Sequence, residues 1–320
     1  MALATNPINI PPEIAATIVQ YAAADDLCVL ARTSRALQHE AEVRIYKHIE
    51  LFHGRRVFQA CLKLIKHRRL APHVRRFVVI SPHGSDFDNG NVISYNHQQT
   101  AQWDNREYWE AMRHAIAGFR DLEYLHIADP LMSHSWVLTP PEGYAGNDQR
   151  TPTIRRRVYD CRLYVACDED MLTFLEESDI QNLTIGDISD DEPPRPLDPD
   201  SLQNLTLFDG PLIMALQLVH TPLTHLKIIL DTVELMSSPV LPMALRELRA
   251  FSQLRSLALM NLPEKAVVAS MDAISTACPN LVYLSLIPLP VEYKLVSVPF
   301  HSGRFASPTI KIDSLPFLLL

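Results

Sequence analysis

A short apolar pattern that recurs along the chain restricts its fold more than any other feature. Each copy has apolar residues at the first, fourth and sixth of six positions, which is typical of a β-strand whose inward side chains share a core with neighbouring strands. Seven segments match, at 74–79, 122–127, 180–185, 202–207, 223–228, 254–259 and 281–286, and 158–163 is a weaker eighth. Because one strand cannot bury its inward side chains alone, the copies are expected to stack side by side.

The later matches have the spacing of a leucine-rich repeat. Those that begin at residues 180, 202, 223, 254 and 281 are separated by close to the roughly 20 to 29 residues of one such repeat. Helices are predicted between some strands, at 168–178 and 265–278, because acidic residues open the first segment and Pro279 follows the second. The pattern therefore predicts an α/β fold of parallel strands with helical returns.

The repeats are irregular, and the predicted solenoid covers residues 74–320. Insertions are expected at 81–106, 129–157 and 187–201, where polar, proline-rich or acidic stretches break the apolar pattern. Since the last repeat needs a cap, Ile310, Ile312 and residues 315–320 are expected to close that end.

The first fifty residues differ from the repeats and predict three short helices. Pro11, Pro12 and Glu13 favour a helix start, and Ile14 and Ile18 follow at helical spacing. Acidic residues at 25–26 and hydroxyls at 33–34 can cap two further helices. Because three short helices bury little apolar area, such a unit needs support from a partner or from the rest of its chain.

Residues 10–51 resemble an F-box, with an isoleucine-proline-proline-glutamate start, Asp26-Leu27, Leu30, residues 33–35 and Ile45-Tyr46. The chain as a whole is similar to fungal F-box proteins with a C-terminal leucine-rich-repeat-like domain. That resemblance implies a three-helix F-box module at 1–51, a basic helical connector at 52–73 and the repeat domain at 74–320. Where the family commonly has leucine-proline, this chain has Ile10-Pro11.

The resemblance also implies a function. Such a chain would be a non-enzymatic substrate-receptor subunit that binds a Skp-family adaptor, and through it a cullin-RING ubiquitin ligase, while its repeats hold a target protein. The implied adaptor-binding residues are apolar: Ile10, Pro11, Ile14, Ile18, Leu27 and Leu30. The alternative is a leucine-rich-repeat scaffold with no ubiquitin-ligase role, in which the same side chains close a helical cap.

Outward strand positions are the expected contact surface for the target, because solenoids present a strand face and loops on one rim. The candidates are Arg75, Glu123, His126, Thr184, Thr206, Lys227, Arg255 and Tyr283. Their mixed chemistry argues against a nucleic-acid groove, which would combine cations with aromatic residues. The cations of 55–69 would attract an acidic partner, a membrane surface or nucleic acid, or they would form a solvated helix face turned toward the acidic rest of the chain.

Composition excludes several other classes of protein. Only 9 glycines occur in 320 residues, which leaves few positions for the phosphate-cradling loops of nucleotide-binding folds and disfavours that class. Five dispersed cysteines indicate neither a disulfide framework nor a zinc site, and no catalytic motif or metal-ligand spacing is found. No cofactor, metal or catalytic residue is therefore predicted. Without a signal peptide or a long apolar window, a cytoplasmic or nuclear location is expected, with no membrane contact.

Overall fold

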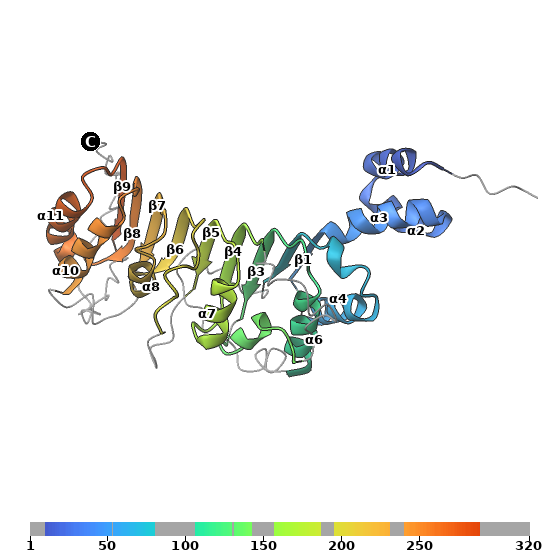
Figure 1. Ribbon diagram of the computed structural model, residues 1–320, viewed down its shortest axis with the longest axis horizontal. Coiled ribbons are helices and arrows are strands. Elements are labelled where there is room, and N and C mark those ends of the chain that lie inside the picture. The colour runs from blue at the N-terminus through green and yellow to red at the C-terminus, as the bar shows by residue number, and fades with distance from the viewer. Residues whose placement is uncertain are drawn as a thin grey trace, which may run out of the picture. The chain divides into compact units, whose positions relative to one another are not determined.

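A single parallel sheet organises the chain in the computed structural model, which describes residues 10–52, 54–80, 106–129, 131–142, 157–186, 195–230 and 240–288. All of these residues belong to one unit, residues 1–289. Nine strands of the described chain pair in parallel, each with the next strand in the sequence (Figure 1). The strands are β1 (His48–Leu51), β2 (Arg76–Val79), β3 (Tyr124–Ala128), β4 (Asp160–Tyr164), β5 (Asn182–Ile185), β6 (Leu207–Pro211), β7 (His225–Ile229), β8 (Ser256–Leu262) and β9 (Tyr283–Pro288). The predicted α/β class with parallel strands is confirmed.

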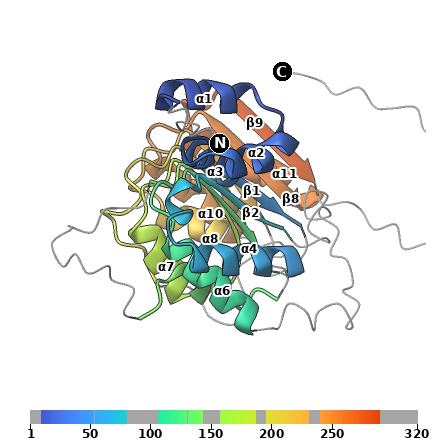
Figure 2. The same ribbon diagram turned by 90° about the vertical axis from the view of Figure 1, so that its right-hand side faces the viewer.

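Helices connect the strands and cover one face of the sheet. They are α4 (Gly54–Lys66), α6 (Arg106–Ala117), α7 (Glu169–Glu176), α8 (Leu212–Gln217), α10 (Val240–Arg246) and α11 (Val267–Ala277), with short 3-10 helices η1 (Ala71–His73), η3 (Ser135–Leu138), η4 (Glu247–Ala250) and η5 (Glu264–Ala266). Figure 2 shows α4, α6 and α7 gathered on the same side of the strands. Parallel neighbours in a sheet require crossover connections of this kind.

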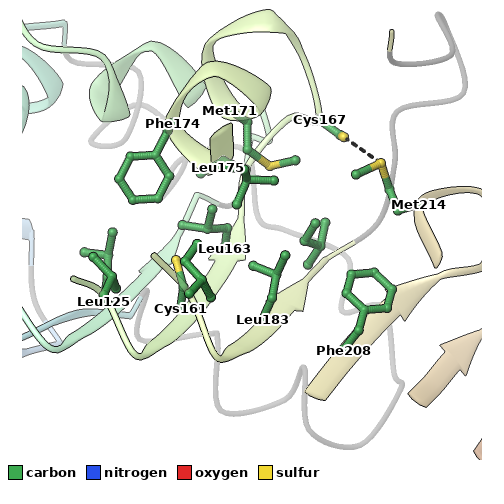
Figure 3. Close-up of a cluster of buried hydrophobic side chains, with 14 of the residues drawn as sticks. Leu125, Cys161, Leu163, Cys167, Met171, Phe174, Leu175, Leu183, Phe208 and Met214 are labelled. Carbon is green, nitrogen blue, oxygen red and sulfur yellow. Dashed lines mark hydrogen bonds between the residues drawn. The ribbon is translucent and has the colours of Figure 1, made fainter. Parts of the chain in front are cut away.

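The core lies between the sheet and these helices. Leu125, Leu183, Leu226 and Leu257 occupy the fourth position of the sequence pattern and are fully or almost fully buried. Successive pattern residues face one another across the strands, because the register pairs Leu125 with Cys161 and Cys161 with Leu183. In Figure 3 these side chains point toward Met171, Phe174 and Leu175 of α7. The apolar pattern is therefore a continuous ladder of buried contacts.

One predicted strand is displaced. The pattern placed a strand at 202–207, whereas β6 begins at Leu207 and its buried residue at the fourth position is Phe208. The sixth position then falls on Gly210, where a Cβ would lie 2.8 Å from Phe208 Cζ and 3.2 Å from the carbonyl oxygen of Ile185. The Phe208 ring therefore fills the space that an aliphatic side chain at position 210 would occupy. Leu202, with φ of 52°, instead forms a turn before the strand.

Strand β1 lies inside the segment 1–51, for which only helices were expected. The backbone of His48–Leu51 pairs with that of Arg76–Val79, and Ile49 is its one buried side chain. The sequence of this strand lacks the apolar pattern of the others. Its backbone pairs with β2, and Ile49 is the one side chain that it contributes to the core. The sheet therefore begins directly after the N-terminal helices.

The insertion predicted at 129–157 contains an ordered loop after β3. The Asp129 carboxylate accepts hydrogen bonds from the backbone N–H groups of Leu131, Ser133 and His134, at 2.7–2.9 Å. The His134 ring bonds the same carboxylate through Nδ1 at 3.0 Å and stacks on Trp109 with 4.5 Å between ring centroids. Asp129 thereby shapes the turn that leads into η3, where a repeat helix would otherwise stand.

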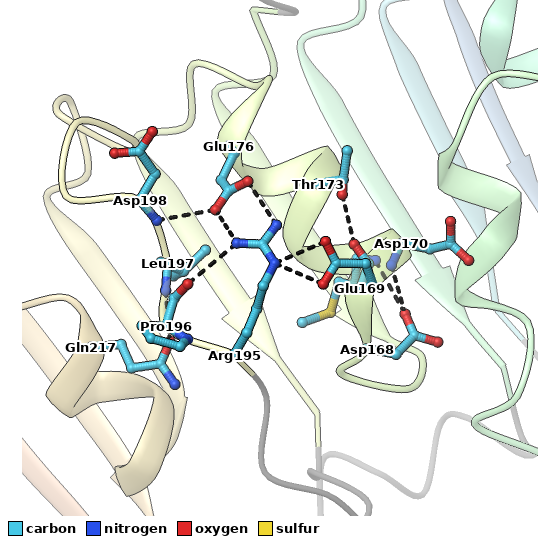
Figure 4. A network of polar contacts seen from close by, with 11 residues as sticks. Asp168, Glu169, Asp170, Thr173, Glu176, Arg195, Pro196, Leu197, Asp198 and Gln217 are labelled. Carbon is cyan, nitrogen blue, oxygen red and sulfur yellow. Dashed lines mark hydrogen bonds and ion pairs between the residues drawn. The ribbon is translucent and has the colours of Figure 1, made fainter.

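The end of the third insertion is anchored by Arg195 (Figure 4). Its guanidinium group donates from Nε to Glu169, at 2.7 and 2.8 Å, and from both Nη atoms to Glu176, at 2.6 and 2.9 Å. Both carboxylates belong to α7. The Arg195 guanidinium holds the pKa of Glu176 below its ordinary value of 4.5, mainly through these hydrogen bonds. This contact fixes the chain where it returns to the sheet.

Two sequence predictions fall outside the described residues. The first is the insertion at 81–106, of which only Arg106 is described, as the first residue of α6. The second is the closing segment with Ile310, Ile312 and residues 315–320. In the part of the chain that is described, each helix is too short or too polar to cross a membrane.

A core substitution tests the ladder of buried contacts. Leu183→Ala should lower the free energy of unfolding by about 2–5 kcal/mol, because it leaves a cavity between β4, β6 and α7. Leu207→Ala, at a leucine of the neighbouring strand that is 36% exposed, should change it by about 0.5 kcal/mol or less. Urea unfolding of both variants measures the difference, and equal losses would contradict the assigned inward and outward faces.

The Arg195 contact predicts a pH dependence. Because the pKa of Glu176 is lowered in the folded state, its ion pair stabilises the fold above pH 4.5 and this contribution is lost as the pH falls through the lower, folded-state value. Glu176→Gln should therefore be less stable than the natural chain at pH 7, and the difference should shrink in acid. Thermal unfolding at pH 7 and pH 3.5 measures it. The exposed neighbour Glu177, changed to Gln, is the control and should show no such convergence.

Candidate functional site

Three helices precede the sheet: α1 (Pro12–Tyr21), α2 (Ala24–Thr33) and α3 (Arg35–Lys47). Proline at the first position and Glu13 in the first turn favour the start of α1. The Ser34 hydroxyl accepts a hydrogen bond from the backbone N–H of Leu37 at 3.2 Å and so caps α3. The sequence signals for helix starts were correctly interpreted at these two places.

These helices share an apolar cluster that is separate from the core of the sheet. Its buried members are mostly small: Ala15, Val19, Leu27, Leu37 and Ala41. A cluster of this size cannot cover all the apolar side chains that α1 and α2 carry. The remaining apolar side chains of α1 and α2 are exposed on the surface.

Most of these exposed apolar side chains lie on the outer surface of α1. Ile14, Ile18 and Tyr21 follow one another at helical spacing and are 53%, 40% and 83% exposed. We call these three residues the apolar α1 face. Val29 of α2 is also exposed, at 60%. Apolar side chains gathered on one helix face in this way are typical of a surface that a partner covers.

Arg44 of α3 holds α1 in place. Its Nη1 donates to the backbone carbonyls of Val19, Gln20 and Ala22, the latter two at 3.0 Å. These carbonyls lie at the C-terminal end of α1, where a cation is favoured by the helix dipole and by unpaired acceptors. Beside this contact lies a hollow of about 520 Å³ lined by Val19, Val43, Lys47 and other residues of α1 and α3.

An ion pair joins α3 to the segment that follows α4. Arg69 donates both Nη atoms to the carboxylate of Glu42, one of them at 2.8 Å. That hydrogen bonding lowers the pKa of Glu42 below its ordinary value, against the opposing effect of burial. Gln38 donates to the same carboxylate at 3.0 Å. Helix α3 is therefore tied by charge to the segment between α4 and η1, as well as to β1 by the chain.

The predicted adaptor-binding residues divide into two groups. Pro11, Ile14 and Ile18 are exposed. Ile10 and Leu30 are partly buried against the helical cluster, and Leu27 is a buried member of it. Leu27 therefore stabilises the three helices instead of offering a surface. The sequence prediction omitted Tyr21 and Val29, although the spacing of Tyr21 from Ile14 and Ile18 could have identified it.

The predicted target-binding residues also divide. His126, Thr184, Lys227 and Tyr283 lie on strands and point to the side of the sheet away from the helices. The others, Arg75, Glu123, Thr206 and Arg255, come one residue before their strands, where backbone hydrogen bonds link Glu123 to Arg75 and Arg255 to Thr224. They form the N-terminal rim of the sheet.

Strand side chains directed away from the helices form what we call the open face. It carries three ion pairs between or along strands: Arg76 with Glu50 at 2.7 Å, Arg162 with Asp160 at 3.4 Å and Lys227 with Asp209 at 2.9 Å. On the rim, Arg75 pairs with Glu123. Since each cation has an acidic partner, the open face is polar without a strong net charge.

The buried thiols do not have the properties of nucleophiles. Burial raises the pKa of Cys61 and of Cys167 to about 12, so both remain protonated at neutral pH. The thiol of Cys167 instead lies 3.6 Å from the sulfur of Met214 within the core. Among the described residues, no group of three or more His, Cys, Asp or Glu side chains is placed to hold a metal ion.

Two comparisons with known proteins found no match. No protein-family description matches the chain, and no curated protein matches its sequence at a significant level. The functional interpretation therefore depends on the apolar α1 face, the open face and the resemblance in residues 10–51.

Removal of the Arg44 side chain tests how the apolar α1 face is positioned. Arg44→Ala should increase hydrogen exchange at the backbone amides of α1 by about tenfold, because charge-assisted hydrogen bonds to the end of that helix are lost. Arg35→Ala, an exposed arginine at the start of the same helix α3, is the matched control and should leave α1 unchanged. Equal exchange in both variants would show that Arg44 does not hold α1.

Proposed function

We propose that this chain is a substrate-receptor subunit of a Skp/cullin/F-box ubiquitin ligase. In this proposal the N-terminal helices bind a Skp-family adaptor, and the strand domain holds a target protein. A separate enzyme of the complex then modifies target lysines, so this chain contributes proximity instead of chemistry. It would act in the cytoplasm or the nucleus.

The observation that carries the proposal is the apolar α1 face. Ile14 and Ile18 belong to the residues that the F-box resemblance implies for adaptor docking, and both are exposed on a helix fixed by Arg44. Burying two isoleucines and a tyrosine would stabilise a complex by a few kcal/mol at about 25 cal/mol per Å² of apolar area. Polar substitution of this face should therefore weaken adaptor binding.

The strand domain would form an irregular leucine-rich-repeat solenoid. The sequential order of the nine strands in the described chain supports this interpretation, since each turn of a solenoid adds one strand beside the previous one. The open face, with its rim residues Arg75, Glu123, Thr206 and Arg255, is then the natural surface for a target.

A repeat scaffold without a ligase role is the second candidate. Leu27 and Leu30 favour it, because these two residues of the implied docking surface pack against the helices' own cluster. Under this alternative the three helices only close the N-terminal end of the sheet, next to β1. The two candidates differ in whether the apolar α1 face binds an adaptor.

Co-purification decides between the candidates. The full chain should retain a Skp-family adaptor, and the double substitution Ile14→Asp and Ile18→Asp should reduce the retained adaptor at least about tenfold, because it places two charges in an apolar contact. Leu27 is unsuitable for this test, since it is buried and its substitution would disrupt the helices.

The matched control changes two other exposed apolar residues. Val268 and Met271 lie on one face of α11 and are 79% and 50% exposed. The control variant carries Val268→Asp and Met271→Asp. This variant should retain the adaptor fully. Circular dichroism should show equal helix content in all three proteins. Retention by the Ile14/Ile18 variant, or no adaptor with the natural chain, would favour the scaffold.

A further inference from the structure

Two arginines of the open face make cation–π contacts with one tyrosine ring. Arg76 of β2 and Tyr124 of β3 face each other in the strand register, and Arg162 follows on β4. The Cζ of Arg76 lies 3.7 Å from the centroid of the Tyr124 ring, and the Cζ of Arg162 lies 5.7 Å from it. Both guanidinium groups are therefore held by cation–π contact over the same ring.

Acidic side chains engage only one edge of each guanidinium group. Arg76 donates from Nε to Glu50 at 2.7 Å, and Arg162 donates from Nε to Asp160 at 3.4 Å. In the described part of the chain, no acidic side chain accepts a hydrogen bond from the Nη atoms of these two arginines, although the Arg76 side chain also forms a hydrogen bond with Tyr124. By contrast, Arg195 uses Nε and both Nη atoms in ion pairs. The side chains of Arg76 and Arg162 are 37% and 46% exposed, so a ligand can reach them.

This arrangement is rich in oriented donors. A planar guanidinium group whose orientation is fixed by cation–π contact can offer two parallel N–H groups to one anionic oxygen group. Burial raises the pKa of the Tyr124 phenol, whose hydroxyl therefore stays protonated at neutral pH. Glu50 and Asp160 balance the positive charge, which makes long-range attraction weak and leaves recognition to the geometry of the donors.

We propose that Arg76 and Arg162, both in cation–π contact with Tyr124, bind an anionic oxygen group of the target, either a carboxylate or a phosphate. The target segment would lie along the open face over β2, β3 and β4. That the ligand belongs to a target protein rests on the proposed receptor function. The anion site itself requires no adaptor.

Nuclear magnetic resonance of the full chain, labelled with ¹⁵N at arginine, tests the site with two small probes. Phenyl phosphate and phenylacetate are added separately, and the side-chain N–H signals of Arg76 and Arg162 are followed. We expect these signals to shift on titration. Arg162→Gln should weaken probe binding about tenfold, because it removes charge-assisted hydrogen bonds.

Lys227→Gln is the matched control, since Lys227 is also a cation of the open face in an ion pair, with Asp209. It should leave probe binding unchanged. Binding of phenyl phosphate alone would indicate a phosphate-bearing target, and binding of both probes would show that a carboxylate suffices. The site is overturned if neither probe shifts the two arginine signals, or if Lys227→Gln weakens binding as much as Arg162→Gln. Adaptor binding is measured separately, so failure of this site leaves the receptor proposal standing.

Discussion

Each strand of the sheet depends on its neighbours in the sequence for the burial of its inward side chains. Leu125, Cys161 and Leu183 face one another across three consecutive strands, and the helices cover them from one side. Since parallel strands are buried through such neighbours, the loss of one contact weakens the next. The described helices that connect the strands leave the other side of the sheet, the open face, uncovered by them (Figure 1 and Figure 2).

The N-terminal helices are governed by a different balance. Their cluster is built from alanine, valine and leucine side chains, which are too few to bury Ile14, Ile18 and Tyr21 as well. Long-range polar contacts add stability that this small apolar cluster does not supply. Arg44 forms hydrogen bonds to the end of α1, and Glu42 forms an ion pair with Arg69. A small core, fixed by charges and carrying exposed isoleucines, suits a unit that is completed by a partner.

The sequence predicted the features that depend on local pattern. The apolar positions of β3, β5 and β7 were correct because each strand contributes side chains of similar size to one core. It placed β6 wrongly, since Gly210 stands where the pattern expects an aliphatic residue and the Phe208 ring fills the space of that side chain. The Arg44 contact and the cation–π contacts of Arg76 and Arg162 with Tyr124 join residues far apart in the chain, and no local signal announces them.

We propose that an adaptor covers the apolar α1 face and leaves the strands of the sheet uncovered. Hydrogen exchange of the full chain, with and without a purified Skp-family adaptor, tests this claim most directly. Adding the adaptor should slow hydrogen exchange in α1 and α2 and leave it unchanged in β3 to β8. Unchanged exchange in α1, or protection confined to the strands, would contradict this claim.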